Sequence, residues 1–268
     1  MSEPLLLIEQ IGAVRRIWFN REGARNAQSM RMLDELDDAL VEAQKDDAVH
    51  VVILAGKGPH FSSGHDLKEG QADRAAFTVE ERWDYEEKRY YDYCMRMWDF
   101  PKPIIAQVQG GCIAGGFMVA NMCDLIVASE DAFFADPVVQ TLAGAAVEIL
   151  IHPWVLGLRK AKEMLFAGTP VGAEEAREMG MVNRVVPLDQ LEAETLALAE
   201  RISKASPFIL RMLKKSLNRT YDAQGFRVSL SAHFDTHQLS HKTEAFKEAT
   251  QSGLDGAISR GRSNVTSS

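Results

Sequence analysis

The sequence has no long apolar run, only three cysteines and no excess of basic residues. No stretch approaches the roughly 20 consecutive apolar residues that a helix needs to cross a bilayer, and residues 1–7 lack the basic region of a secretory signal. Cys94, Cys112 and Cys123 have no metal-site spacing, so we expect reduced, mostly buried thiols. These absences predict a cytoplasmic protein that uses no metal and binds no membrane.

The charge balance argues against a second group of functions. The 268 residues include 38 acidic and 30 basic side chains, and the net charge of −8 disfavours binding to nucleic acid or to an anionic membrane surface. Hydrophobic residues make up 46% of the chain, which is enough for a sizeable core. No internal repeat or low-complexity linker is visible, which favours one compact unit with a helical carboxyl-terminal extension.

Strands and helices are expected to alternate over the first two thirds of the chain. Apolar runs predict strands at 5–9, 14–19, 51–56, 104–108, 124–129, 132–137 and 182–186. Ser29 is a plausible N-cap, residues 74–98 predict a charged and aromatic helix over a groove, and 142–166 a helical region interrupted by Pro153 and Gly157. From residue 188 onward the pattern is helical. This order indicates an α/β fold with right-handed crossovers.

Clustered glycines at 109–118 follow the apolar run 103–108 and precede an Ala- and Met-rich segment. The pattern predicts a strand, a tight turn and a buried helix. Glycines let backbone N–H groups approach a ligand closely, and the first N–H groups of a helix have no partner within the helix. These groups lie at the positive end of the helix dipole, so we predict half of an oxyanion hole here.

A second glycine turn, at 61–69, also follows a buried strand, and the two together carry a family resemblance. Residues 61–69 resemble the F-x-A-G-x-D-[LI] loop of the crotonase (enoyl-CoA hydratase/isomerase) superfamily. Residues 103–124 are similar to its P-[VI]-I-A-x-[VI]-x-G-x-x-x-G-G-G-x-x-[LV]-x-x-x-C-D motif, with Ala114 in place of the first glycine of the triplet. The resemblance covers nearly the whole chain in the family's order.

The resemblance implies a fold, an assembly and a substrate class. The expected fold is a crotonase-like spiral of repeated ββα units with a C-terminal helical trimerisation region, which we place at residues 1–200 and 201–268. Family members form trimers or dimers of trimers, so a homotrimer or homohexamer is expected. The implied ligand is an acyl-CoA thioester, with no cofactor beyond the CoA moiety.

The resemblance also implies the site residues. The two oxyanion-hole N–H groups of the family fall on His65 and Gly115, with the thioester carbonyl between them and the enolate stabilised there. The family's pantetheine and adenine contacts map to a set of residues in two segments: Ala24, Arg25, Ser63, His65, Asp66 and Leu67.

Two positions depart from the hydratases of this family. The two glutamates that position and activate water are replaced by Met118, three residues beyond Gly115, and by Val138, after Pro137. A thioether and a branched alkane cannot exchange protons, so acid and base chemistry cannot come from these positions. Isomerisation, decarboxylation or carbon–carbon cleavage is therefore as well supported as hydration.

Three side chains remain as acid or base candidates. Asp136 ends a strand expected to face the acyl pocket, although Asp before Pro also commonly caps a backbone N–H. Glu148 stands alone in the apolar run 145–151, which suggests a proton-transfer group or an exposed residue of an amphipathic helix. An imidazole can exchange protons near neutral pH, which makes the His65 side chain a third candidate, but the backbone role of this residue needs no side chain.

Two residue clusters have more ordinary explanations. His233, His237 and His241 recur at helical spacing, but no companion acidic cluster is apparent, so a solvated or interface face is favoured over a metal site. The aromatic residues of 83–93 could line an acyl pocket or pack against the core. The sequence predicts an acyl-CoA enzyme of the enoyl-CoA hydratase/isomerase family. The alternative is an inactive acyl-CoA-binding protein.

Overall fold

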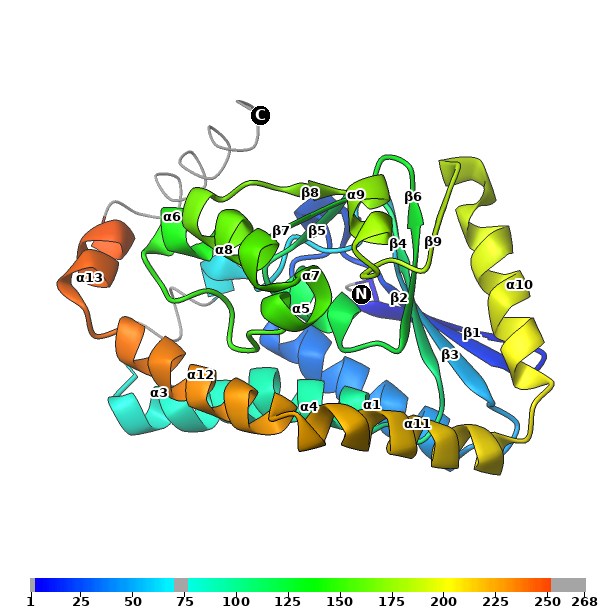
Figure 1. The fold of residues 1–268 in the computed structure, drawn as a ribbon. Helices are drawn as coiled ribbons and strands as arrows, with labels where there is room; N and C mark the ends of the chain where they lie inside the picture. The colour runs from blue at the N-terminus through cyan, green and yellow to red at the C-terminus, as the bar shows by residue number, and fades with distance from the viewer. Residues whose placement is uncertain (1–2, 70–76, 252–268) are drawn as a thin grey trace.

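Two β-sheets form the centre of the part of the chain that the structure, a computed structural model, describes, namely residues 3–69 and 77–251 (Figure 1). The larger sheet has the strand order β1 (Leu6–Ile11), β2 (Val14–Phe19), β3 (Val51–Gly56), β4 (Ile104–Val108), β6 (Leu125–Ser129) and β9 (Arg184–Val186). Only the β1–β2 pair is antiparallel within it. The smaller sheet has the order β5 (Gly111–Ile113), β7 (Phe133–Ala135) and β8 (Val171–Gly172). The predicted α/β class is confirmed.

Helices surround both sheets. The first half of the chain contributes η1 (Glu22–Ala24), α1 (Met30–Lys45), α3 (Val79–Glu86), the π-helix η2 (Glu87–Asp92), α4 (Tyr93–Trp98) and α5 (Gly115–Asn121). The second half contributes α6 (Val138–Leu142), α7 (His152–Leu156), α8 (Leu158–Ala167), α9 (Ala173–Glu178), η3 (Leu188–Gln190), α10 (Leu191–Ser203), α11 (Pro207–Ala223), α12 (Phe226–Ser240) and α13 (Glu244–Gln251). The Ser29 side chain caps α1 by accepting from the Met32 N–H, as predicted.

The larger sheet is buried on both faces, and the two-residue period of its strands explains why. In β3, Val52 and Leu54 face the main core with α1, α4 and α5. Val51 and Ile53 face a second core that α10 covers. Continuous apolar runs are typical of parallel strands covered on both sides. The main core therefore lies between the sheet and the helices that carry the candidate site.

The chain passes repeatedly from the larger sheet to the smaller one. Strand β4 belongs to the larger sheet, β5 to the smaller, and α5 follows; β6, β7 and α6 repeat this order. These are the ββα units that the resemblance implies. Two residues separate β4 from β5, so the glycine-rich stretch 109–118 leaves the larger sheet, forms β5 of the smaller sheet and enters α5 at Gly115.

One predicted helix is wrong. The expected helical region at 142–166 begins only at His152, and residues 143–151 form an irregular segment between α6 and α7. Ala143 and Ala146 adopt left-handed backbone angles, with φ of +53° and +60°, which end α6 and prevent a helix from forming. The Asp136 carboxylate accepts a hydrogen bond from the Val147 N–H at 3.1 Å and helps to hold this conformation.

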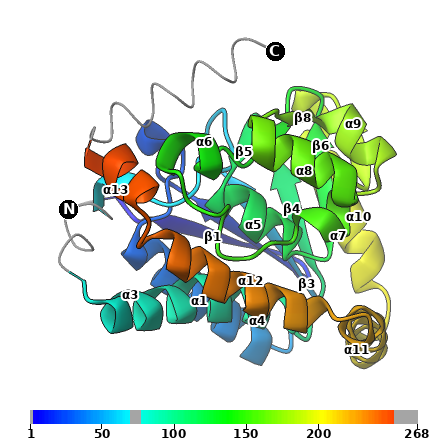
Figure 2. The same ribbon diagram turned by 60° about the vertical axis from the view of Figure 1, so that its left-hand side comes forward.

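The carboxyl-terminal helices α11 and α12 lie on the outside of the molecule, away from the two sheets. In Figures 1 and 2, α12 runs alongside α3 and α4, while α11 lies at the periphery and is seen end-on in Figure 2. One face of α11 exposes a row of apolar side chains: Phe208, Ile209, Met212, Leu213 and Leu217. Trimerisation through this region stays a prediction. Within residues 3–69 and 77–251, no helix combines the length and the apolar character that crossing a membrane requires.

Candidate active site

The two glycine turns meet at the start of α5. The loop after β3 pairs with residue 28 on one side, through hydrogen bonds from the Gln28 N–H to the Gly64 carbonyl (2.8 Å) and from the Asp66 N–H to the Gln28 carbonyl (2.9 Å). On the other side the Ile113 N–H of β5 donates to the Ser62 carbonyl at 3.0 Å. The loop is therefore fixed between two segments distant in sequence, with His65 next to Gly115.

Close backbone approach explains the glycines here. Gly64 has φ of +88°, and a Cβ on it would lie 2.9 Å from the Gly115 nitrogen. Ala114, with φ of +49°, turns the chain into α5. Neither the His65 N–H nor the Gly115 N–H donates a hydrogen bond to any residue in the described ranges. An oxyanion hole requires N–H donors that no protein acceptor uses, and this role of His65 and Gly115 remains a prediction.

The His65 ring covers Gly115 and is held from two directions. Its Nε2 lies 3.1 Å from Oε2 of Glu148, and the ring stacks on Tyr90 with 3.8 Å between centroids. Tyr90 belongs to the π-helix η2, a rare element that is often found at functional sites. A Cβ on Gly115 would lie 2.8 Å from His65 Nδ1 and 2.9 Å from Gln28 Oε1. Both atoms are buried without a hydrogen-bond partner among the residues described.

Glu148 comes from the irregular segment that the sequence did not predict. Its side chain is 5% exposed, so it belongs to the interior and not to the surface of an amphipathic helix. Burial opposes its ionisation, but the neighbouring His65 and His237 rings hold the pKa of Glu148 well below its ordinary value. The structure therefore brings together two of the predicted candidates, His65 and Glu148, which lie 83 positions apart in the sequence.

Asp136 has a different environment. Its Oδ1 accepts from the Val138 N–H and its Oδ2 from the Val147 N–H, both at 3.1 Å. The side chain is fully buried, and the ring of His152 lies 3.2 Å from Oδ2 and stacks on Phe117. These contacts match the capping interpretation of an Asp before Pro, and no described contact joins Asp136 to His65 or Gly115.

The histidine row of α12 faces the protein interior, so the solvated-face prediction is wrong. His237 is 3% exposed, and its Nε2 lies 3.4 Å from Glu86 Oε2 and 3.5 Å from Glu148 Oε1. Burial alone would lower the pKa of His237, but the two carboxylates raise it to about 10. Burial lowers the pKa of His241 to about 3, against the opposing effect of Glu86. The acidic partners were missed because Glu86 and Glu148 lie in distant segments.

Glu86, His237 and His241 offer ligand atoms that all lie within 4.8 Å of one another, the arrangement closest to a metal site in the described part of the chain. A cation already lies in this cluster. The Arg82 guanidinium donates to Glu86 Oε1 at 2.9 Å and lies 3.2 Å from His241 Nδ1. The second Glu86 oxygen accepts from Gln238 Nε2 at 2.7 Å. We therefore assign the cluster as a hydrogen-bonded ion-pair network.

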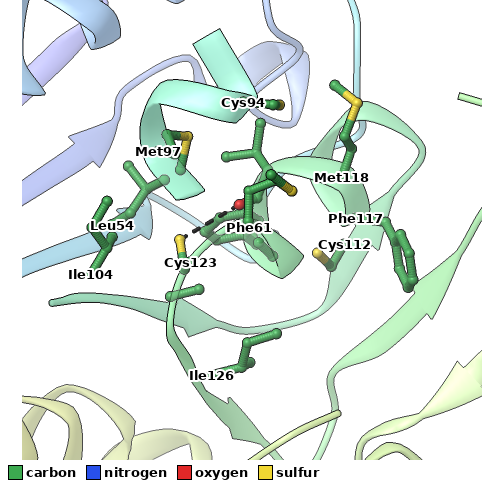
Figure 3. Close-up of a cluster of buried hydrophobic side chains, with 14 of the residues drawn as sticks. Leu54, Phe61, Cys94, Met97, Ile104, Cys112, Phe117, Met118, Cys123 and Ile126 are labelled. Carbon is green, nitrogen blue, oxygen red and sulfur yellow. Dashed lines mark hydrogen bonds between the residues drawn. The ribbon is translucent and has the colours of Figure 1, made fainter. Parts of the chain in front are cut away.

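Apolar side chains occupy the two positions that replace the hydratase glutamates, and both pack against the main core. Met118 is 1% exposed and lines a cavity of about 10 Å³ between α1, α4 and α5. Figure 3 shows it among the sulfur and aliphatic side chains of the core, including Cys94 and Met97. Val138 begins α6 and packs against the same core. Neither residue offers a group that could activate water.

The predicted CoA contacts lie on two segments that a backbone hydrogen bond joins. Residues 24–25 end the 3₁₀ helix η1, and the Ser63 N–H donates to the Arg25 carbonyl at 3.0 Å. Asp66 accepts from Arg21 Nη2 at 2.9 Å, and its other oxygen accepts from the N–H groups of residues 68 and 69. Ala24 and Arg25 are exposed, and Ser63 and Leu67 are half-buried. Contact with CoA stays a prediction for these residues.

Comparison with known proteins identifies the family and supports the fold. Residues 9–255 match the family model described as enoyl-CoA hydratase/isomerase, and the chain belongs to this family. It is 41% identical over 249 residues to EchA13 of Mycobacterium tuberculosis, covering 86% of this chain and 78% of that protein.

Solved structures of enoyl-CoA hydratases and isomerases have the same fold as this chain. An enoyl-CoA hydratase/isomerase from Xanthobacter autotrophicus Py2 superposes with a TM-score of 0.89 at 35% identity, covering 98% of both chains. A probable enoyl-CoA hydratase from Mycobacterium smegmatis gives 0.83 at 45% identity, covering 88% of this chain and 94% of that one. The predicted superfamily and its fold are confirmed.

Proposed function

We propose that this protein is an acyl-CoA enzyme that moves a proton along an unsaturated acyl chain, as an enoyl-CoA isomerase does. The observation that carries the proposal is the 3.1 Å contact between Glu148 and the ring of His65, a ring that lies against Gly115 at the start of α5. The same residue thus supplies a hydrogen-bond donor for the thioester oxygen and a side chain that can exchange protons.

The enolate would be held by the two free N–H groups. When a proton leaves the carbon next to the thioester, negative charge moves to the carbonyl oxygen. Donors aimed at this oxygen stabilise the charge, and losing one typically costs about 3 kcal/mol of transition-state stabilisation. Gly115 is the first residue of α5, so its N–H also lies at the positive end of the helix dipole.

The base would be Nδ1 of His65. An ionised carboxylate only accepts hydrogen bonds, so Glu148 fixes the hydrogen of the neutral ring on Nε2. Nδ1 then carries the lone pair, on the side of the ring that faces Gly115. It would take a proton from C2 of a 3-enoyl thioester, leaving a dienolate, and return the proton to C4. The product is the conjugated 2-enoyl thioester.

One base suffices for this reaction but not for efficient hydration. Hydration needs one group to activate water and another to protonate the carbon next to the thioester, and Met118 and Val138 stand where hydratases have these acids. Decarboxylation and carbon–carbon cleavage also proceed through the enolate, but neither explains a buried carboxylate aimed at the His65 ring. Isomerisation gives a role both to the Glu148 carboxylate and to the His65 ring.

The CoA part of the substrate would bind along the surface formed by residues 24–25 and 63–67. A backbone hydrogen bond joins these two segments, so a bound ligand would meet a preformed site. Arg25 is the exposed cation of this set and would face the phosphates. The thioester itself supplies the reacting group, and we propose no further cofactor.

A binding protein without catalysis is the second candidate. The observation in its favour is that Nδ1 of His65 is fully buried and that the ring covers Gly115, so a substrate must displace other atoms to reach the base. Such a protein would bind acyl-CoA esters tightly and release them unchanged.

Turnover of acyl-CoA thioesters separates the two candidates. The purified protein is mixed with a 3-enoyl-CoA, a 2-enoyl-CoA and a β-hydroxyacyl-CoA of equal chain length, and products are followed by ultraviolet absorbance and mass spectrometry. We expect conjugation of the 3-enoyl ester and little hydration of the 2-enoyl ester. Tight binding of all three esters without any product would refute isomerisation and support the binding protein.

A further inference from the structure

Two histidines of α12 contact the backbone of the segment that carries Glu148. His237 Nδ1 lies 3.0 Å from the Ala146 carbonyl, and His233 Nε2 lies 2.9 Å from the Val147 carbonyl. These two carbonyls precede Glu148 directly, and Ala146 has the left-handed backbone that a non-glycine residue rarely adopts. α12 therefore holds in place the irregular segment from which Glu148 reaches the site.

Both ring nitrogens of His237 face acceptors. Nδ1 faces a backbone carbonyl, which can only accept, so it carries a hydrogen. Nε2 lies between Oε2 of Glu86 and Oε1 of Glu148, at 3.4 and 3.5 Å. These separations are longer than aligned hydrogen bonds, so the contacts are a shared ion pair. A ring whose two nitrogens both face acceptors is an imidazolium.

A protonated His237 balances the charges of Glu86, Glu148 and Arg82. α3 supplies Glu86 and Arg82, the 143–151 segment supplies Glu148, and His233 and His241 flank it on α12. Two carboxylates and one guanidinium would leave a net buried charge, which is costly, and a protonated His237 cancels it. The raised pKa of His237 agrees with this count.

We propose that His237 is a positioning residue, the cation that keeps Glu148 ionised and turned toward His65. The assignment rests on the proposed function, because its consequence is the state of the base. With one oxygen of Glu148 paired to His237, the other accepts from Nε2 of His65, and Nδ1 is left free. Without the cation, Glu148 would gain a proton and could donate to His65, and the ring would lose its preferred tautomer.

The test compares His237→Gln with the wild type. Glutamine can still donate to the Ala146 carbonyl but carries no charge. His50→Gln is the matched control, since His50 contacts the Ser203 carbonyl at the end of α10, away from the site. We expect His237→Gln to lower kcat roughly 100-fold with KM changed less than about threefold, and His50→Gln to leave both unchanged.

Nitrogen-15 NMR of histidine-labelled protein gives a readout that is independent of turnover. At pH 7 the wild type should show hydrogens on both nitrogens of His237 and on Nε2 alone of His65. In His237→Gln, His65 should become a mixture of tautomers. A singly protonated His237 in the wild type, or an unchanged His65 tautomer in the variant, would overturn the assignment. If the variant does not fold, the wild-type spectrum still decides. If the spectra agree with the prediction but the protein turns over no substrate, the isomerase proposal is refuted and the assignment of His237 stands.

Discussion

A methyl group at Gly115 would enter space that the His65 ring now occupies. A Cβ there lies 2.6 Å from His65 Cε1, 2.8 Å from Nδ1 and 2.9 Å from Gln28 Oε1. The ring cannot yield easily, because Glu148 holds Nε2 and Tyr90 stacks on one face. Gly115→Ala therefore has to move the proposed base, the thioester site or both.

Two effects compete in this variant, and their sizes decide the outcome. Gly115 has an ordinary helical backbone, so alanine should favour α5 by about 1 kcal/mol. Overpacking of a close-packed interior costs roughly 1 to 3 kcal/mol, so the net change in unfolding free energy should be small or unfavourable. Loss of the oxyanion-hole geometry costs about 3 kcal/mol of transition-state stabilisation, or about a hundredfold in rate.

The assay is conjugation of a 3-enoyl-CoA, with thermal unfolding measured on the same samples. Gly172→Ala is the matched control, because no atom lies within 4 Å of a Cβ built on Gly172. We expect the control to keep wild-type activity and Gly115→Ala to lose about a hundredfold while remaining folded. Full activity in Gly115→Ala would refute the placement of the thioester beside the His65 ring.

Four further predictions concern other parts of the molecule. Glu148→Gln should lower turnover by roughly 100-fold with little change in CoA-ester affinity by calorimetry, whereas equal loss of both would indicate a purely structural carboxylate. Met118→Glu should not restore hydration and should destabilise the fold by roughly 3 kcal/mol in denaturant titrations, because the new carboxylate is buried in a cavity whose lining is mainly apolar and includes Asp37 as well as Arg89; a stable, active hydratase would contradict this. Between pH about 6.5 and 10 the wild type should lose about 1.4 kcal/mol of stability per pH unit as folded His237 keeps a proton that the unfolded chain releases, and His237→Gln should lack this slope; parallel curves would rule it out. Leu213→Glu on the exposed face of α11 should convert a trimer or hexamer to smaller species by light scattering, and a wild-type monomer would count against this interface.

The parts of the fold that depend on local pattern could be predicted from the sequence. Strand β3 is apolar throughout because α10 and the main core cover its two faces, and Ser29 caps α1 through its own side chain. The glycines at 64 and 115 were informative because close backbone approach leaves few alternatives to glycine. For residues of this kind, the local sequence is enough to predict the structure.

The contacts that distinguish the site could not be predicted in this way. Glu148 lies in a segment of alanines and aliphatic residues that favour a helix, but Ala143 and Ala146 adopt left-handed backbones. Hydrogen bonds with Asp136 and His237 hold the segment at Val147 and Ala146. The inward orientation of His237 depends on Glu86, which is distant in the sequence. Gln28, which lies beside Gly115, belongs to no recognisable sequence motif. Side-chain partners of this kind are set by the assembled fold.

Hydrogen exchange at the carbon next to the thioester tests the central claim most directly. A saturated acyl-CoA is incubated with the protein in D₂O, and loss of the α-proton signal is followed by NMR. His65→Gln keeps the backbone N–H but removes the proposed base. The account predicts exchange catalysed by the wild type and a loss of roughly 100-fold or more in the variant, with the ester still bound. Equal exchange rates in the two proteins, or none in the wild type, would contradict it.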